Sequence, residues 1–536
     1  MVKIFQNLFR KITLFVCLAT SSAGLAQINL ANKELRKLLL TETAIQSLYV
    51  DSMDESKLVE SAVLGMIKQL DPHSAYTAAK DVQALTEPLK GGFEGIGVQY
   101  NMVEDTLVVI QPVANGPSEK VGIIAGDRIV FVNDTIIAGV KMTKEGIMKL
   151  LRGPKGSKVK LGIKRQGIKG INDFIVTRDK IPLYSIDAKY MIDNETGYVH
   201  INNFGATTHD EFANILLELK NKGMKNLIID LQGNGGGYLE AAVNISNELL
   251  ENNDLIVYTE GRVTKRKEYH SNGLGYFKEG KVVVLIDSYS ASASEILAGA
   301  VQDNDRGIVV GRRSFGKGLV QRQIDLPDGS LIRLTTAHYY SPSGRCIQKP
   351  YKLGNRKDYD SDLEERLKSG ELTNVDSIHF PDSLKFTTLK KHRTVYGGGG
   401  IMPDIYVPLD TNTYTSFHRE LAAKSCIVNT TLKYIDQNRN HLKKTYKTFE
   451  AFNANFCVPQ DMIDLLLENA QKAKIEYNDS ILQKSLPLIK LQLKALLARD
   501  MWDMSEYYQI INTTNEIYLK ALEALKDDKY ESTFHI

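Results

Sequence analysis

The stretch KVVVLIDSYSASASEILAGAVQDN, from Lys281 to Asn304, sets the class of fold. It opens with an almost continuous apolar run of strand length, KVVVLID, and closes with ASEILAGAVQDN, which is typical of a helix. Strands that are apolar along their whole length are usually buried on both faces in a parallel sheet. The stretch therefore predicts one strand and helix unit of an α/β domain.

The same alternation occurs on both sides of this unit. Strand-like runs lie in TGYVHINNF, NLIIDL and GIVVG, and helix-like runs lie in DEFANILLELKNK and LEAAVNISNELLE. This pattern extends over residues 181–408 and predicts a parallel sheet covered on both faces. Within it, VQRQIDL and LIRLTTAHYY flank PDGS, as in a hairpin with a glycine turn.

The flanking regions have other patterns. Residues 27–90 show helical spacing of apolar residues, and residues 409–536 are helical and Leu-rich. Residues 91–180 hold short β-like runs separated by turn signals such as NGP and AGD, which predicts a compact β-rich module. With 536 residues the chain is too long for one core, so we expect an α/β multidomain protein.

The N-terminal sequence MVKIFQNLFRKITLFVCLATSSAGLAQ has the pattern of a secretory signal. We expect residues 1–26 to be a signal peptide cleaved after Ala26, with an uncleaved membrane anchor as the alternative. The protein would then be exported to the periplasm or cell envelope. No later segment is apolar for long enough to cross a bilayer, so we expect no stable membrane span after cleavage.

Composition and cysteine content exclude several classes of protein. The net charge of +3, with 24% charged residues, gives no electrostatic footprint for nucleic acid. Three scattered cysteines, Cys346, Cys426 and Cys457, follow the signal and do not make a disulfide scaffold, although a bridge between Cys426 and Cys457 stays open. No CxxC or Cys/His cluster suggests a metal site.

The serines of SASAS admit two interpretations. Ser292 and Glu295 fit a capping box, in which the serine only begins a helix. A serine at a helix N-terminus after an apolar strand is also well placed as a nucleophile, because exposed N–H groups and the helix dipole favour negative charge there. From these residues alone the capping interpretation is favoured.

A serine nucleophile needs a base, and histidine is not an obvious one here. Of the 10 histidines, His73 in LDPHS and His338 in LTTAHYY stand out most, and we expect both to be structural. Lys317 lies in FGKGLVQ, a stretch with few other charges, and burial can make a lysine neutral. Its pKa would have to fall from about 10.4 to roughly 7 or 8, which requires a closed apolar site.

Glycine-rich stretches invite a nucleotide-binding hypothesis but fit it poorly. GRRSFGKG resembles a P-loop, yet Gly318 stands where the Mg²⁺ ligand belongs and a strand follows. GNGGGY has Tyr238 in place of the third glycine of a dinucleotide fingerprint. The glycines after LIIDL suit either a tight turn or a group of N–H donors for an oxyanion, and both interpretations stay open.

As a set, the motifs resemble the carboxy-terminal processing peptidases, also called tail-specific proteases. The matching elements follow the family's order over about residues 40–408: LDPHSAY, GGFEGIGV, GDRIVFVND, LRGPKGSKV, GYVHINNF, LIIDLQGNGGG, SASASE, SFGKGLVQ and GGGIMPDIYVP. The resemblance implies a crotonase- or Clp-protease-like α/β peptidase core with an inserted PDZ domain. It also implies an exported serine endopeptidase that uses a Ser–Lys dyad. Serine acyl-transfer chemistry would call for no cofactor.

The resemblance assigns roles to single residues. It makes Ser292 the nucleophile, Lys317 its base and Gln321 the group that orients the lysine, while Asp303 matches an acidic position of uncertain role. We expect oxyanion N–H donors at Ala293 and at Gly236 or Gly237. In the PDZ domain, Arg152 matches a residue that couples tail binding to the active site, and the loop that receives the tail's carboxylate is Gly95, Ile96, Gly97 and Val98.

Two departures from the family pattern concern the glycine loop. Gln232 stands where relatives usually have arginine, and Gly235 where many have proline. Neither removes a catalytic group. The expected partners are protein substrates with free C-terminal tails, and a homodimer is allowed. The alternative functions are a catalytically silent PDZ scaffold of the cell envelope and, from another class, a nucleotide-binding enzyme.

Overall fold

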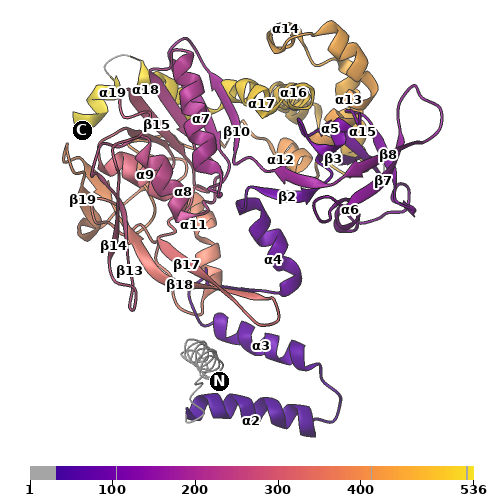
Figure 1. The fold of residues 1–536 in the computed structure, drawn as a ribbon. Helices are drawn as coiled ribbons and strands as arrows, with labels where there is room; N and C mark the ends of the chain where they lie inside the picture. Colours follow the sequence, from indigo (N-terminus) through magenta and orange to yellow (C-terminus); the bar gives the residue numbers. More distant parts are fainter. Residues whose placement is uncertain (1–31, 104, 412, 527–528, 536) are drawn as a thin grey trace, which may run out of the picture.

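The computed structural model describes residues 32–103, 105–411, 413–526 and 529–535 (Figure 1). The predicted signal peptide, residues 1–26, lies outside the described residues. Within these ranges, no helix combines the length and the apolar character needed to span a membrane.

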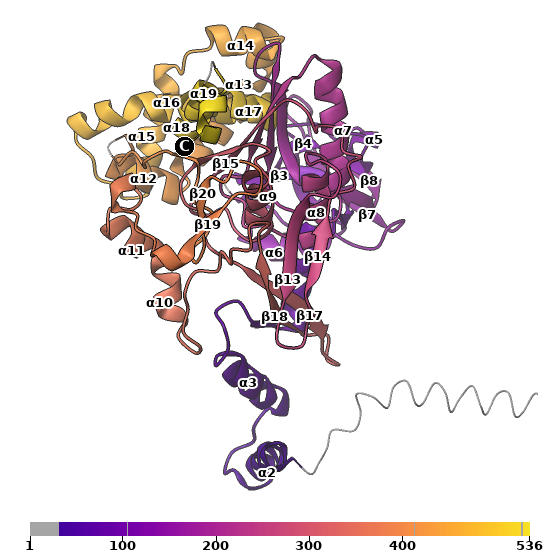
Figure 2. The same cartoon turned by 90° about the vertical axis from the view of Figure 1, so that its left-hand side faces the viewer.

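The N-terminal helices project from the body of the molecule, as Figures 1 and 2 show. Helices α2 (Lys33–Leu48) and α3 (Glu55–Ile67) contain no buried residue. The chain then enters the body through β1 (Ala75–Thr77), α4 (Ala79–Thr86) and the short 3-10 helix η1 (Glu87–Leu89). This segment thus brings LDPHSAY to the α/β core, because β1 pairs with β18 (Leu331–Tyr340), a strand of that core.

The β-rich module forms one antiparallel sheet. Its strand order is β3-β4-β5-β7-β8, which leaves β3 at an edge: β3 (Val98–Val103), β4 (Thr106–Pro112), β5 (Arg128–Val132), β7 (Lys158–Lys164) and β8 (Asn172–Thr177), with β6 (Thr135–Ile136) beside β5. Two helices complete it, α5 (Pro117–Lys120) and α6 (Lys144–Leu151). The strands at its two ends, β2 (Gly92–Gly95) and β9 (Asp179–Pro182), pair with each other and connect it to the core.

The α/β core is built on a six-stranded sheet. Its order is β10 (Ile186–Met191), β11 (Thr196–Ile201), β12 (Asn226–Asp230), β15 (Lys281–Ile286), β16 (Ile308–Gly311) and β21 (Ile405–Tyr406). The predicted parallel strands are confirmed from β11 to β21, whereas β10 runs antiparallel to β11. Antiparallel edge strands are common in such mixed sheets.

Different segments cover the two faces of this sheet. Helices α7 (Thr208–Asn221), α8 (Leu239–Asn247) and α9 (Ala293–Asp303) pack on one face, in a core that includes Phe212, Ile245 and Leu297. The other face packs against α18 (Glu516–Leu525) and α19 (Lys529–Ser532), through residues such as Tyr518 and Ala521. The C-terminal extension therefore completes the hydrophobic core of the sheet, because it buries the face that the crossover helices leave open.

A second sheet lies on the other side of α9. The predicted hairpin is confirmed as β17 (Leu319–Asp325) and β18 (Leu331–Tyr340), and β18 also pairs with β1 and with β13 (Leu255–Glu260), whose other neighbour is β14 (Lys267–His270). All eleven residues of α9 are buried, since packing surrounds the helix. The segment after β18 holds α10 (Arg356–Asp360), α11 (Asp362–Lys368), β19 (Lys385–Thr387) and β20 (Thr394–Tyr396).

The rest of the extension is a helical unit with its own hydrophobic core. It consists of α12 (Ser416–Ala423), α13 (Cys426–Thr445), α14 (Phe449–Asn455), α15 (Gln460–Lys472), α16 (Asp479–Met501) and α17 (Met504–Ile511). Asp436 of α13 forms an ion pair with Arg128 of β5, so the extension touches the β-rich module as well as the core sheet. The bridge between Cys426 and Cys457 that the sequence left open is not formed: both cysteines are free.

Candidate active site

The SASAS loop presents Ser292 and buries its two neighbours. Ser290 Oγ donates to the Leu231 carbonyl at 2.7 Å, and Ser294 Oγ donates to the Asn234 carbonyl at 2.9 Å. Both serines are therefore fully engaged in holding the loop against the segment after β12. Ser292 is partly exposed and has φ 57° and ψ −112°, a conformation that L-residues adopt only when their surroundings impose it.

The glycines after β12 pass directly beside Ser292. A Cβ on Gly236 would lie 2.6 Å from the Ala291 carbonyl oxygen and 2.8 Å from Ser292 Cβ, so only glycine fits there. The Gly236 N–H donates to Asn234 Oδ1 at 2.8 Å. In the described part of the chain, the N–H groups of Gly237 and Ala293 have no acceptor. Of the two glycine alternatives, Gly237 is therefore the one with an N–H available for an oxyanion.

Glu295 ties the serine segment to the lysine segment. Its Oε1 accepts from Ser314 Oγ at 2.6 Å and from Gly316 N at 2.7 Å. Its Oε2 accepts from Ser292 N at 2.8 Å and from Lys317 N at 2.9 Å. All four partners donate, which suits an ionised carboxylate, although burial raises the pKa of Glu295 above its usual range. The sequence identified this residue only as half of a capping box.

Lys317 follows this loop, two residues before β17 begins, and is partly buried. Its Nζ donates to Gln321 Oε1 at 3.2 Å, and Gln321 Nε2 donates to the His73 carbonyl oxygen. Burial lowers the pKa of Lys317 below 10.5, and the charge of Arg333 lowers it further. No hydrogen bond among the described residues joins Lys317 Nζ to Ser292, so the two residues expected to form a dyad are not in direct contact in this conformation.

Tyr339 connects the backbones of the two dyad residues. Its hydroxyl oxygen lies 2.6 Å from the Lys317 carbonyl oxygen and 3.1 Å from the Ser292 carbonyl oxygen. The residue belongs to β18 and is only 2% exposed. Nothing in LTTAHYY identified it beforehand, because its role depends on the packing of β18 against α9.

Neither histidine that stood out in the sequence occupies a base position. The His73 ring accepts or donates a hydrogen bond with the Tyr359 hydroxyl at 2.7 Å, and burial lowers its pKa to about 3. His73 instead contributes its backbone carbonyl, which holds Gln321. The His338 ring lies 4.0 Å from Cys346 Sγ. The prediction for His73 concerned its ring and did not include this contact, in which the His73 carbonyl is linked to Lys317 through the Gln321 amide.

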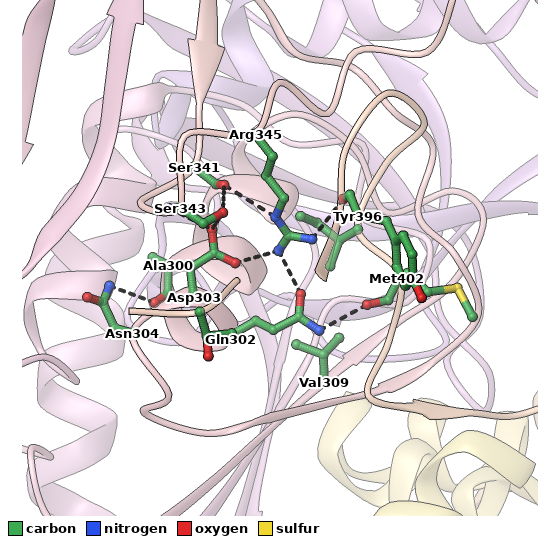
Figure 3. A network of polar contacts seen from close by, with 12 residues as sticks. Ala300, Gln302, Asp303, Asn304, Val309, Ser341, Ser343, Arg345, Tyr396 and Met402 are labelled. Atoms are coloured by element: carbon green, nitrogen blue, oxygen red, sulfur yellow. Dashed lines mark hydrogen bonds and ion pairs between the residues drawn. The ribbon is translucent and has the colours of Figure 1, made fainter. Parts of the chain in front are cut away.

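Asp303 lies away from the dyad, at the opposite end of α9 from Ser292. Figure 3 shows its carboxylate against the Arg345 guanidinium, with Oδ1 2.6 Å from a terminal nitrogen of that group. Asp303 Oδ2 accepts from the Ser343 N–H and hydroxyl, and Arg345 also donates to Gln302 and to the Tyr396 carbonyl. Asp303 and Arg345 are both fully buried. This network anchors the C-terminal end of the helix that carries Ser292.

The predicted tail-binding loop lies in the β-rich module, apart from the dyad. A small pocket of about 60 Å³ opens there, lined by Phe93, Gly95, Ile96, Gly97, Val98, Tyr100, Met148, Leu151 and Arg152. Ile96 and Gly97 lie between β2 and β3, and their N–H groups have no acceptor among the described residues. Such N–H groups can receive a carboxylate.

Arg152 lies at the edge of this pocket and contacts the segment that leads to the core. Its guanidinium forms an ion pair with Glu87 of η1 and stacks over Phe93, 4.8 Å from the ring centroid. Arg152 therefore links the pocket to the chain that enters the core.

The two departures from the family pattern have different surroundings. Gln232 Nε2 donates to both carboxylate oxygens of Asp230 at 3.1 Å, and Tyr198 donates to the same carboxylate at 2.6 Å. Asp230 is thus held by neutral donors, and burial raises its pKa. A side chain on Gly235 would meet open space. No described group of His, Cys, Asp and Glu residues could hold a metal ion.

Replacing Glu295 by glutamine tests its linking role. A glutamine offers one acceptor oxygen to four donors, and its NH₂ group would face two of them. We expect a loss of stability of about 1–3 kcal/mol and, because small displacements of reacting groups are costly, a fall in kcat of roughly 10- to 100-fold. Denaturant unfolding and steady-state kinetics measure both. The matched control is Glu240→Gln in the first turn of α8, which is exposed and should change neither; unaltered kcat in Glu295→Gln would contradict the role.

Comparisons with known proteins agree with this architecture. Family models match as Peptidase family S41 over residues 195–360, as a PDZ domain over 95–170, and as the Activating protease CtpB N-terminal domain over 18–81. A family of unknown function matches residues 417–503. The fold and these matches define a serine-type peptidase that carries a PDZ domain.

Relatives along most of the chain identify the family. The carboxy-terminal processing protease CtpB of Bacillus subtilis is 35% identical over 365 residues, which cover 66% of this chain and 75% of the relative. CtpA of the same organism is 29% identical over 488 residues, 90% of this chain and 96% of the relative. The photosystem II D1 C-terminal processing protease is 27% identical, with a TM-score of 0.31, over 59% of this chain and 90% of that structure. The chain belongs to the carboxy-terminal processing protease family.

Proposed function

We propose that the protein is an exported serine endopeptidase that recognises the C-terminal tails of protein substrates through its PDZ domain and cleaves them with a Ser292–Lys317 dyad. The observation that supports this most is the Glu295 carboxylate, which binds the N–H groups of Ser292 and Lys317 at once. A carboxylate shared in this way keeps the two segments in register. One of these segments carries a partly buried lysine with a lowered pKa, and the other carries a strained serine.

The proposed reaction is acyl transfer. Neutral Lys317 takes the proton from Ser292 Oγ, and the alkoxide attacks the carbonyl carbon of the scissile peptide. The N–H groups of Ala293 and Gly237 stabilise the oxyanion of the tetrahedral intermediate. As this intermediate collapses, protonated Lys317 gives its proton to the departing amine and the acyl-enzyme remains. Lys317 next takes a proton from water, the hydroxide attacks the ester, and the lysine returns the proton to Ser292 as the trimmed protein leaves.

In this proposal the observed conformation is a resting state. Lys317 Nζ is bonded to Gln321, so it must turn toward Ser292 before the reaction can begin. Arg152 is the candidate for the signal, because it borders the tail pocket and pairs with Glu87 on the segment that leads to the core. A bound tail that moved this pair would act on the chain containing His73, whose carbonyl holds Gln321.

Export to the periplasm or cell envelope rests on the basic and apolar pattern of residues 1–26. A catalytically silent PDZ scaffold remains the competing function. It differs in an observable way, since a scaffold would bind tails without trimming them.

Tail recognition is tested with two forms of one substrate, a model protein that ends in a free carboxylate or in a carboxamide. The carboxamide lacks the negative charge that the N–H groups of Ile96 and Gly97 would bind in the tail's carboxylate. It should therefore be cleaved with a kcat/KM roughly 10- to 100-fold lower, since hydrogen bonds to charged groups contribute about 1.5–3 kcal/mol. The control is a peptide too short to reach both pocket and dyad, for which amidation should make no difference. Equal cleavage of the two forms would show that the tail's carboxylate is not recognised. Cleavage of neither form would favour the scaffold.

A further inference from the structure

Arg333 is a cation of the active site for which the described residues provide no hydrogen-bond or ion-pair partner. It lies on β18 opposite Gln323 of β17 and opposite Ala75 of β1. Its Nε is buried without a hydrogen-bond partner, and no ion pair to its guanidinium occurs among the described residues. Other arginines of the core, such as Arg345 and Arg393, are paired with carboxylates. An arginine left unpaired in a partly buried place calls for a reason.

The hairpin register places Arg333 on the face of the sheet that carries Gln321. Gln321 pairs with Thr335 and Gln323 pairs with Arg333, so Arg333 and Gln321 are diagonal neighbours on one face. Gln321 is the residue that binds Lys317 Nζ. Arg322, between the two glutamines, pairs with Leu334 and points to the other face. The register therefore brings one guanidinium, and not its neighbour, toward the lysine.

The carboxylates near Lys317 are already occupied by other donors. Glu295 accepts four hydrogen bonds, from Ser292, Ser314, Gly316 and Lys317 N–H or hydroxyl groups. Asp71 accepts four, from the His73 N–H, from the Ser74 N–H and hydroxyl, and from the Thr335 hydroxyl. Neither carboxylate forms an ion pair with Arg333 or with Lys317 Nζ in the described residues. The lysine thus shares its site with a second positive charge that no carboxylate neutralises directly.

We propose that Arg333 is a positioning residue that acts on Lys317 through its charge, disfavouring the ammonium form so that the neutral amine is available to take the proton of Ser292. This inference rests on the proposed function of Lys317. Like-charge pairing is one of the ways in which a lysine is made into a base. The other charged or titratable groups described around the lysine are Glu295 on α9, Asp71 and His73 on the segment before β1, and Tyr339 on β18, whose hydroxyl donates to the Lys317 carbonyl and whose pKa is raised by burial. The two carboxylates oppose Arg333, and the His73 ring stays neutral, because burial lowers its pKa to about 3.

The test is the pH dependence of kcat/KM for a tailed model protein, which reports the protonation of the free enzyme. Removing the cation in Arg333→Gln or Arg333→Met lets Lys317 hold its proton to higher pH. The acid limb should move up by about 0.5–1 pH unit, which lowers kcat/KM roughly 3- to 10-fold on that limb and leaves the high-pH plateau unchanged. Arg333→Lys keeps the charge and should keep the limb in place. Arg322→Gln removes an exposed arginine from the opposite face and should also leave it in place.

The outcomes separate this inference from the proposed function. An acid limb in the wild type that does not move in Arg333→Gln and Arg333→Met, while both remain folded by thermal melting, overturns the role of Arg333 and leaves Lys317 as the base. A rise in KM without a shift of the limb also overturns it, because it would make Arg333 a substrate contact. Full activity in Lys317→Ala would instead overturn the proposed function itself.

Discussion

Ser292→Ala is expected to abolish cleavage of a tailed protein, with a fall in kcat of roughly 10⁴- to 10⁶-fold, the range seen when a nucleophile of an acyl-transfer enzyme is removed. Lys317→Ala should lose a comparable factor, because nucleophile and base act as a unit. For the same reason the double variant should be no worse than either single one. The measurement is single-turnover cleavage, together with labelling by a serine-directed acylating probe. Wild type should be labelled at Ser292, and Ser292→Ala should not be labelled.

The flanking serine provides the matched control. Ser294→Ala removes a buried hydroxyl that donates to the Asn234 carbonyl, so it should cost stability while keeping most of kcat. A variant that only loosened the loop would behave like Ser294→Ala and still acylate. If Ser292→Ala and Lys317→Ala cleaved as fast as wild type, the site assignment would be wrong; a wild type that neither cleaves nor reacts with the probe would favour the scaffold.

The second large effect is expected at the buried pair in Figure 3. Asp303→Asn leaves the Arg345 guanidinium fully buried without its counter-charge, and Arg345→Met leaves the Asp303 carboxylate in the same state. Each should destabilise the core by about 3–5 kcal/mol, the usual cost of breaking a buried ion pair. The loss should be measured by denaturant unfolding followed on the peptidase core, because unfolding of several domains need not be two-state.

A surface pair calibrates this expectation. Lys368 and Glu364 are 71% and 65% exposed and one helical turn apart, so breaking their contact should cost less than about 0.5 kcal/mol. The double variant Asp303→Leu with Arg345→Met should recover part of the loss, because apolar replacement of a whole buried pair is often neutral. Equal effects at the surface pair and the buried pair would show that the network does not anchor α9.

Much of the core could be predicted because its signals are local. KVVVLID and NLIIDL form the expected parallel strands, and PDGS turns the expected hairpin. The antiparallel direction of β10 could not be predicted from the sequence, because the direction of a strand depends on the path of the chain between it and its neighbour in the sheet. The sequence predicted that helices cover both faces of the sheet, but not which helices cover which face. Helices α7, α8 and α9 share one face, and α18, more than 200 residues after α9, covers the other.

The site divides in the same way. The roles of Ser292, Lys317 and Gln321 follow from the resemblance of the motifs to a peptidase family, and they remain proposals that the dyad variants test. The linking role of Glu295, the contacts of the Tyr339 hydroxyl and the lack of a described partner for Arg333 could not be predicted, because each depends on how segments far apart in the sequence pack together.

Periodicity and turn residues were enough to predict an α/β core, a β-rich module and helical flanks, because such patterns express the local preferences of the backbone. The peptidase and PDZ assignments came from the resemblance of the ordered motifs to a known family. The sequence patterns could not show that the Gly236 N–H donates to Asn234 while the Gly237 N–H has no acceptor among the described residues. Nor could they show that, in this part of the chain, Lys317 Nζ is hydrogen-bonded to Gln321 and not to Ser292. Those facts depend on long-range packing, which sets the solvent exposure, donors and charges around each group and so decides its protonation and its reach.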